Sequence, residues 1–148
     1  MSLSAADHAQ LGRILYDAMR ANTPIQPLTK THPTITVEDA YQISRTMLSH
    51  RLERDREVVV GKKIGVTSDA VQSMLGVFQP DFGFLTNTMT FANKSDIRIA
   101  GNMISPRAEG EIAFRLKSTL CGTANTEDDV LAATECIMPC FEIVDSRV

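Results

Sequence analysis

The chain has 148 residues, enough for one domain with its own hydrophobic core. With 43% hydrophobic and 22% charged residues its composition is that of an ordinary globular protein, and a formal net charge of −3 without a Lys/Arg run argues against a nucleic-acid binder. No apolar run approaches the about 20 residues of a membrane span, and residues 1–10 lack the apolar segment of a secretory signal. We therefore expect a cytoplasmic protein that binds neither nucleic acid nor membrane.

Two amphipathic helices are predicted in the first third of the chain. Ser4 with Asp7 has the spacing of an N-terminal cap, and apolar residues then recur at helical spacing to about Asn22. Three prolines make the next stretch, 23–35, an irregular connector. Thr36 with Asp39 repeats the capping signal, and the second helix ends in the charged stretch 51–57.

A buried strand is predicted to open at Val58 and to run to Gly65. Its alternation puts Lys63 on the same face as Gly61 and Gly65, and on the opposite face from Lys62. A lysine flanked by glycines leaves room for a molecule to approach it, although two solvated lysines are an equally good interpretation. Thr67 or Ser68 then caps a short helix over 69–75, which Gly76 ends.

Asp81 is the one acid in an apolar run from Phe78 to Leu85. Its Pro-Asp-x-Gly context is typical of a turn, where the carboxylate accepts backbone hydrogen bonds. Burial among the three phenylalanines would instead raise the pKa of Asp81 and suit it to proton transfer. The sequence leaves both interpretations open.

Three strands and one helix are predicted in the last third. Ile97, Ile99 and Ile104 suggest a strand, and a second one carries Glu109 and Glu111 over 105–116. Thr126 caps a helix that runs to Ala133, and 137–148 forms a last strand. The three cysteines fit no common zinc spacing and are expected to be buried free thiols: Cys121, Cys136 and Cys140.

Three glutamates are the candidate metal ligands. Glu109 and Glu111 project from one strand face roughly 7 Å apart, a gap that one hard cation with oxygen ligands can bridge. Glu142 shares a face with Cys140 and Met138, an apolar neighbourhood in which a carboxylate needs a partner. The competing interpretation is a solvated strand face, which is where charges in half-buried strands usually lie.

Four segments together resemble a known family. These are Gly61–Ser68, Gly76–Gly83, Ala108–Phe114 and Pro139–Arg147. They are similar to the 2-hydroxypenta-2,4-dienoate hydratases of the fumarylacetoacetate hydrolase superfamily, from bacterial meta-cleavage degradation of aromatic compounds. The resemblance implies an α+β fold in which N-terminal helices precede part of a mixed β-roll. Residues 1–55 would form the helical part and residues 56–148 the β-rich part with the metal site.

The resemblance also implies roles for individual residues. Glu109, Glu111 and Glu142 would bind Mg²⁺ or Mn²⁺, Lys63 would be the lysine of the substrate pocket, and Asp81 is a candidate general acid or base. The substrate would be a small 2-hydroxydienoic acid, and the product 4-hydroxy-2-oxopentanoate.

The resemblance implies one interpretation of the whole chain and leaves two alternatives to it. Because family members are longer, residues 1–148 read as a single truncated hydratase domain, whose complete form is expected to be a homo-oligomer. A decarboxylase acting on 4-oxalocrotonate shares the fold and the metal ligands, and is one alternative. A truncated, non-catalytic partner of such a decarboxylase is the other.

Overall fold

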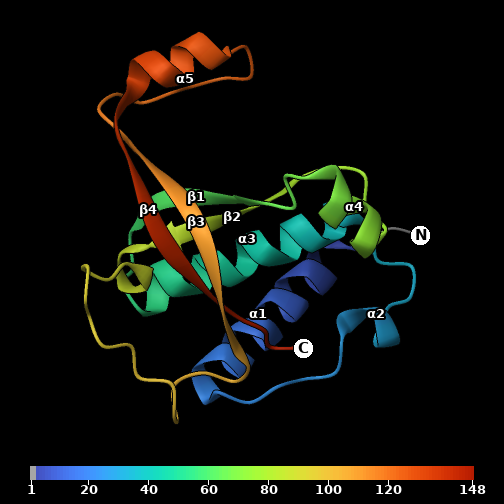
Figure 1. The fold of residues 1–148 in the computed structure, drawn as a ribbon. Coiled ribbons are helices and arrows are strands. Elements are labelled where there is room, and N and C mark those ends of the chain that lie inside the picture. The colour runs from blue at the N-terminus through green and yellow to red at the C-terminus, as the bar shows by residue number, and fades with distance from the viewer. Residues whose placement is uncertain (1–2) are drawn as a thin grey trace. The chain divides into compact units, whose positions relative to one another are not determined.

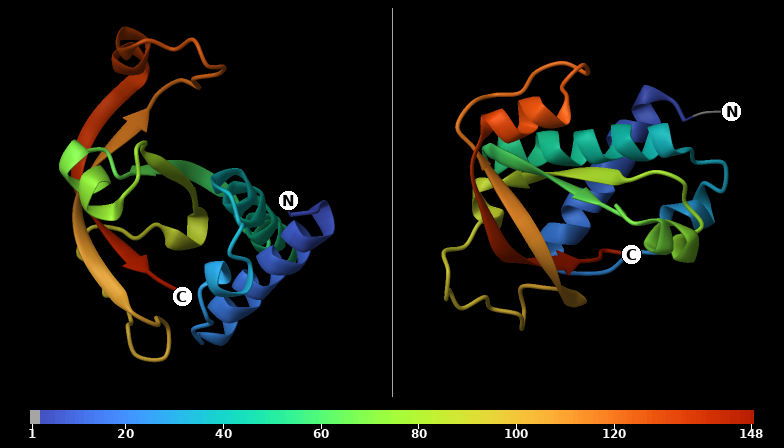
Figure 2. Two further views of the ribbon diagram at one scale, coloured as in Figure 1. Left: turned by 90° about the vertical axis from the view of Figure 1, so that its right-hand side faces the viewer. Right: turned by 45° about the horizontal axis from the view of Figure 1, so that its top comes forward.

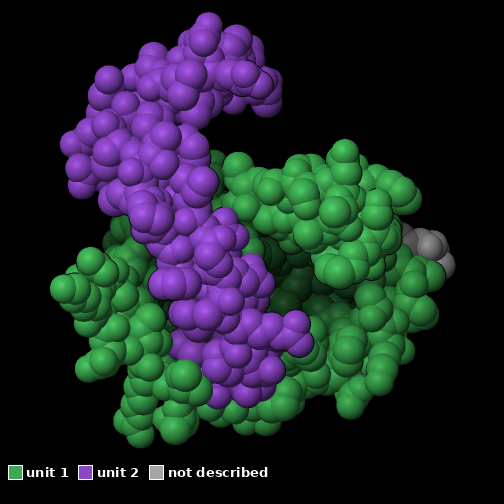
Figure 3. Space-filling model, in the orientation of Figure 1, with its two compact units in different colours: residues 1–102, 147–148 green, residues 103–146 purple. Residues whose placement is uncertain are grey.

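The computed structural model describes residues 3–148, which form two compact units (Figure 3). The first unit holds the described residues up to Asn102 together with Arg147 and Val148, and the second holds Met103–Ser146. Each unit mixes helices with an antiparallel pair of strands, and these two pairs are the sheets formed by residues 3–148. The two units are described separately below.

The elements of the first unit follow the predicted order (Figure 1). They are α1 (Ala5–Ala21), α2 (Leu28–Thr31), α3 (Val37–Arg54), β1 (Val59–Gly65), α4 (Asp69–Leu75), β2 (Asp81–Thr86) and the 3₁₀ turn η1 (Asn87–Met89). The one-turn helix α2 lies in the proline-rich connector, which the sequence analysis left irregular. The second unit consists of β3 (Pro106–Leu116), α5 (Glu127–Ala133) and β4 (Thr134–Asp145).

The predicted helix starts are confirmed at atomic detail. Ser4 and Thr36 cap α1 and α3 with reciprocal bonds: each hydroxyl accepts the backbone N–H three residues on, and the aspartate there accepts the cap's own N–H. Thr126 starts α5 in the same way, and Ser68 caps α4. Asn22 and Gly76 end α1 and α4 in the left-handed conformation. Local pairs of this kind can be predicted because both partners lie in one turn of chain.

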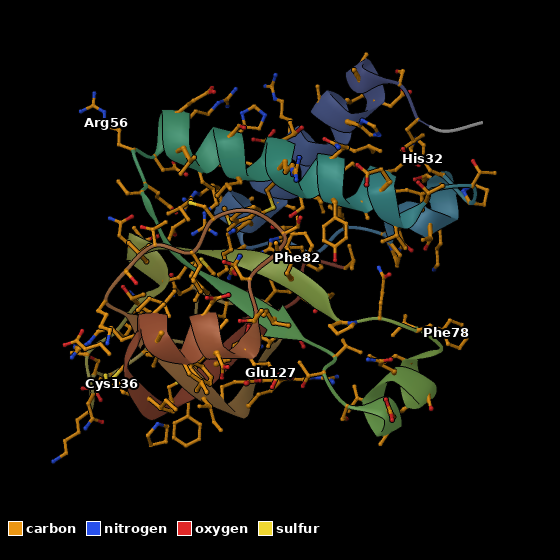
Figure 4. All side chains as sticks on the ribbon, turned by 90° about the horizontal axis from the view of Figure 1, so that it is seen from above. His32, Arg56, Phe78, Phe82, Glu127 and Cys136 are labelled. Atoms are coloured by element: carbon orange, nitrogen blue, oxygen red, sulfur yellow. The ribbon has the colours of Figure 1, made fainter. Side chains whose placement is uncertain are left out.

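The core of the first unit lies between α1 and α3, which pack against each other. Gly12 makes the close approach possible, since a Cβ at this position would lie 2.6 Å from the Cβ of Thr46. The buried apolar side chains of this interface are Leu11, Tyr16, Ala18, Ile43 and Met47. Phe82 of β2 stacks on Tyr41 of α3, with ring centroids 4.4 Å apart, which ties the strand pair to this helix (Figure 4).

A buried ionic cluster joins both helices to the strand pair. The carboxylate of Glu57 is 2% exposed and receives hydrogen bonds from Arg20 at 2.6 Å and from Arg51 at 2.8 Å. Arg51 also donates to the hydroxyl of Thr86, which is completely buried. Arg20 in turn pairs with Asp55 at the end of α3. Burial by itself raises the pKa of Glu57, but hydrogen bonds from Thr86, Arg51 and Arg20 outweigh it and hold this pKa below its ordinary value.

Strand β1 is not the buried strand that the sequence predicted. Val58, Val59 and Val60 are 37–60% exposed, and Ile64 is 64% exposed. The valine run pointed to a strand covered on both faces, but β1 pairs with β2 alone. Periodicity reports which residues share a face and does not report what covers that face.

The second unit is built on the long antiparallel pair of β3 and β4, which run side by side in both views of Figure 2. The predicted strand over 137–148 begins three residues earlier, at Thr134, and ends at Asp145. One face of the pair is apolar and open to solvent: Ile112 is 65% exposed and Phe141 is 80% exposed. Pro139 lies opposite Ile112, within a strand that has one partner and therefore tolerates a missing donor.

Two other predictions were wrong. The described chain forms no strand over 97–104, because local turns satisfy its backbone: Lys94 and Gly101 have positive φ, and Asn102 N–H bonds Ile99 O. The cysteines are free, as expected, but not buried, since Cys121 and Cys140 are exposed and Cys136 is half-buried.

None of the helices within residues 3–148 combines the length and apolar composition that a bilayer crossing requires.

Candidate metal centre

Three carboxylates converge on one face of the β3–β4 pair. Glu109 and Glu142 are direct partners in the ladder, and Glu111 lies two residues from Glu109, opposite Cys140. One oxygen from each of Glu109, Glu111 and Glu142 lies within 4.8 Å of the other two. Residues directly opposite in an antiparallel pair point to the same face, so the register alone brings the distant Glu142 to the other two.

The donor set fits a divalent cation by simple geometry. Two oxygens on one ion are separated by at most twice the metal–oxygen distance, which is about 4.2 Å for Mg²⁺ and about 5 Å for Ca²⁺. The three oxygens lie within 4.8 Å of one another, so a single divalent ion of this size range can contact all three.

Electrostatics also favour a cation at this position. Glu109 and Glu111 are exposed and Glu142 is half-buried, and all three bring negative charge to one small area. Like charges directly across an antiparallel pair repel each other, so this arrangement destabilises the strands unless the charge is neutralised. A divalent ion with oxygen preference is the simplest counter-charge for three carboxylates.

Lys63 and Asp81 form a second group, in the first unit. Lys63 of β1 lies opposite Gly83 of β2, and Asp81 lies opposite Gly65. A Cβ built on Gly65 would lie 2.6 Å from Asp81 Oδ1 and 3.4 Å from Lys63 Nζ. The ammonium and the carboxylate therefore share the space above Gly65, within about 6 Å of each other. This geometry allows them to act on the same small molecule.

The position of Asp81 agrees with neither interpretation left open by the sequence. It is the first residue of β2, in the ladder with β1, and not a turn residue. Its side chain is exposed, so burial among the phenylalanines does not occur. Phe82 points to α3, as its stacking on Tyr41 requires, and the neighbouring Phe78 is 94% exposed.

Gly83 was missed by the sequence analysis although it shapes this group. A Cβ at Gly83 would lie 3.1 Å from Lys63 Cγ, so the lysine stem passes directly over this glycine. The glycines flanking Lys63 on its own strand were noticed, but the third lies across the ladder. The signal that could have found it is the register of the two strands, which the sequence analysis did not assign.

No family model matches the chain, but solved structures and sequence relatives do. Two solved structures of 4-oxalocrotonate decarboxylase from Pseudomonas putida G7 superpose on 98% of the chain, covering 54% and 55% of their own length. The one complexed with magnesium and adipate has a TM-score of 0.84 at 28% identity, and the one with calcium and acetate 0.88 at 29%. The class is therefore the mixed helix-and-strand fold of these decarboxylases and the related hydratases.

Sequence relatives narrow this class. A 2-hydroxypent-2,4-dienoate hydratase from Pseudomonas putida is 56% identical over 139 residues, which are 94% of this chain and 62% of the relative. A 2-hydroxyhexa-2,4-dienoate hydratase from Comamonas testosteroni is also 56% identical, over 93% of this chain and 52% of its own length. The chain belongs to the 2-hydroxypenta-2,4-dienoate hydratase family, and it spans between half and two thirds of the length of these two relatives.

Proposed function

We propose that this chain contributes the metal-binding part of a hydratase that converts 2-hydroxypenta-2,4-dienoate to 4-hydroxy-2-oxopentanoate in the degradation of aromatic compounds. The convergence of Glu109, Glu111 and Glu142 is the single observation that carries the proposal. Similarity to named hydratases over more than nine tenths of the chain supports the choice of reaction.

In this proposal the three glutamates hold Mg²⁺ or Mn²⁺. When bound, the ion supplies positive charge that stabilises negative charge on the substrate's carboxylate and 2-oxygen. Magnesium and calcium complexes of the decarboxylase with the same fold support a divalent ion. Mg²⁺ and Mn²⁺ are chosen because both accept carboxylate ligands.

Lys63 and Asp81 then handle protons. Hydration places a proton on C5 and a hydroxyl on C4, while the 2-hydroxyl loses its proton and C3 gains one, so that one water is added overall and the 2-hydroxydiene becomes a 2-oxo acid. As a neutral amine Lys63 is suited to taking up the proton of the 2-hydroxyl, and the ammonium so formed is suited to donating a hydrogen bond to the 2-oxygen. Asp81 is suited to orienting the attacking water, since its carboxylate accepts hydrogen bonds and is exposed to solvent. Both roles rest on the shared space above Gly65.

We place this chemistry in a larger assembly. The complete fold is proposed to be a mixed β-roll of the fumarylacetoacetate hydrolase type, in which residues 1–55 form the helical part and 56–148 the β-rich part of a single domain. The complete protein is proposed to be a homo-oligomer that also associates with 4-oxalocrotonate decarboxylase. A cytoplasmic location agrees with three free cysteines, which persist as thiols in a reducing compartment.

Loss of the dienol's ultraviolet absorbance on addition of Mg²⁺ or Mn²⁺ tests the proposal. The matched control is Glu109→Gln with Glu111→Gln, which removes two ligand charges and should leave the absorbance constant. Absorbance loss that proceeds equally in the double variant would contradict the metal-dependent mechanism.

Two other functions are alternatives. The likeness to the decarboxylase structures favours release of CO₂ from 4-oxalocrotonate, and CO₂ release without hydration would identify it. A non-catalytic partner of such a decarboxylase is the second alternative. Binding of Mn²⁺ with no turnover of either substrate would identify that role.

A further inference from the structure

The carboxylate of Asp145 holds the beginning of β3 against the end of β4. Its Oδ1 accepts the backbone N–H of Ser105 at 2.7 Å and that of Ile104 at 3.0 Å, and Oδ2 lies 3.1 Å from the Ile104 nitrogen. Asp145 is half-buried, and it is the last residue of β4. Two backbone donors are bound by one side chain, so these contacts attach the start of β3 to the end of β4.

A proline explains why a side chain is used here. Pro106 is the first residue of β3 and lies directly opposite Asp145 in the ladder. Proline has no N–H, so β3 cannot donate to β4 at this position. The two donors before it, on Ile104 and Ser105, are bound instead by the Asp145 carboxylate. The attachment therefore adds hydrogen bonds between the two strands next to a position at which β3 has no donor.

This attachment lies three residues from the metal ligand on the same strand. Glu142 pairs with Glu109 only in the observed register, in which Asp145 pairs with Pro106. A slip of one residue turns every side chain of a strand to the other face. Glu109 and Glu111 would then point away from Glu142, and the three oxygens would no longer lie within 4.8 Å of one another.

We propose that Asp145 is a positioning residue that fixes the β3–β4 register and thereby the spacing of the metal ligands. The proposal rests on the function proposed above for Glu109, Glu111 and Glu142. Asp145 acts by accepting hydrogen bonds, and its charge is secondary. Asp145 lies within the Pro139–Arg147 segment, for which the sequence suggested a role only at Glu142.

Two variants separate hydrogen bonding from charge. Asp145→Ala removes the acceptors, whereas Asp145→Asn removes the same charge and keeps Oδ1, the atom that accepts from both Ile104 and Ser105. Asp128→Ala, at the exposed start of α5 in the same unit, removes an equal charge away from the register. Mn²⁺ affinity is measured for all four proteins by titration calorimetry, and the register by cross-strand NMR contacts of Gly110 with Phe141, its partner in the ladder.

We expect Asp145→Ala to weaken Mn²⁺ binding by roughly tenfold or more, the usual effect of removing support for metal ligands. The Gly110–Phe141 contact should weaken in the same variant, while Asp145→Asn and Asp128→Ala should bind Mn²⁺ as the unchanged chain does. Equal loss of affinity in Asp145→Ala and Asp145→Asn would overturn the proposal, because charge would then be the cause. An unchanged Asp145→Ala variant would also overturn it.

Failure of the proposed function gives a different pattern. If the unchanged chain binds no Mn²⁺, the proposed metal-binding role of the three glutamates is contradicted. The NMR contacts still decide whether Asp145 fixes the register. A Gly110–Phe141 contact that persists in Asp145→Ala would overturn the register claim whether or not the metal binds.

Discussion

Glu109 and Glu142 face each other as direct partners across β3 and β4, although 32 residues of sequence separate them. This pairing converts a repeat of two acids on one strand into a three-carboxylate group. Repulsion among the three carboxylates is the cost, and a bound cation removes it. The candidate metal centre is therefore a property of strand register, and the predictions below test that register and the groups around it.

Removal of two ligand charges should abolish metal binding. In Glu109→Gln with Glu111→Gln, two of three hard ligands become neutral, and Mn²⁺ affinity measured by calorimetry or electron paramagnetic resonance should fall below detection. The control is Glu127→Gln with Asp128→Asn, which removes two acidic charges from the first turn of α5. An unchanged Mn²⁺ affinity in Glu109→Gln with Glu111→Gln would show that these glutamates do not bind the metal.

Replacement of Glu57 by Ala should destabilise the first unit strongly. The change leaves Arg51, whose side chain is 11% exposed, without its carboxylate partner. Breaking a buried ion pair by removing one member costs about 3–5 kcal/mol. Urea unfolding measures the loss. Asp17→Ala is the control, because Asp17 pairs with Arg13 on the exposed face of α1 and should change stability by less than about 1 kcal/mol.

The same glutamate should make stability depend on pH in a defined direction. Because the pKa of Glu57 is lower in the folded chain than its ordinary value of 4.5, the folded state binds fewer protons than the unfolded state around this pH. The stabilisation is therefore complete above pH 4.5 and is lost as the pH falls through that value towards the folded pKa. Glu57→Gln should flatten the urea-midpoint profile in this range. A profile that keeps its full slope would show that other groups cause the acid sensitivity.

Gly65→Ala should displace the candidate catalytic pair. The new methyl group would lie 2.6 Å from Asp81 Oδ1, so the carboxylate must move. We expect the chemical shifts of Asp81 and of the Lys63 side chain to change, with loss of any hydratase activity. Gly110→Ala is the matched control, because a Cβ at that strand glycine has no neighbour within 4 Å. Unchanged Asp81 and Lys63 signals in Gly65→Ala would contradict the geometry above this glycine.

Gly12→Ala should destabilise the packing of α1 on α3. Its Cβ would lie 2.6 Å from the Cβ of Thr46 and 2.8 Å from the Ile43 carbonyl oxygen, both of which are held by α3. Overpacking of this kind costs about 1–3 kcal/mol. Better helix propensity returns about 1 kcal/mol, so a net loss is expected in thermal unfolding. Ala9→Gly, on the exposed face of α1, measures the propensity contribution alone. A raised melting temperature in Gly12→Ala would contradict the close approach.

Local signals in the sequence predicted the helix boundaries well. Ser4 with Asp7, Thr36 with Asp39 and Thr126 with Asp129 each start a helix where expected, because each pair is closed within one turn. The convergence of the glutamates also agrees with expectation, since a period of two determines which residues share a strand face. Their role as metal ligands stays a prediction.

Properties that depend on distant partners were not predictable. In the Glu57 cluster, Arg20 lies 37 positions from Glu57 and Arg51 lies 35 positions from Thr86, and no local pattern marks these contacts. The prediction of burial failed for the same reason, since the valines of β1, Cys121 and Cys140 have the composition of a core and yet are exposed. Ile97 and Ile99 alternate like a strand, yet strand formation requires a second strand to accept the backbone hydrogen bonds.

The position of α5 has a consequence for how chain length can vary in this family. Residues 117–133 connect β3 to β4 at the end of the pair away from Asp145, as Figure 1 shows. Because pairing between the two strands sets the distances among the three carboxylates, this connection can gain or lose residues without moving them. Insertions should therefore be tolerated after Leu116, whereas a single deletion between Pro106 and Glu111 should be fatal to the site.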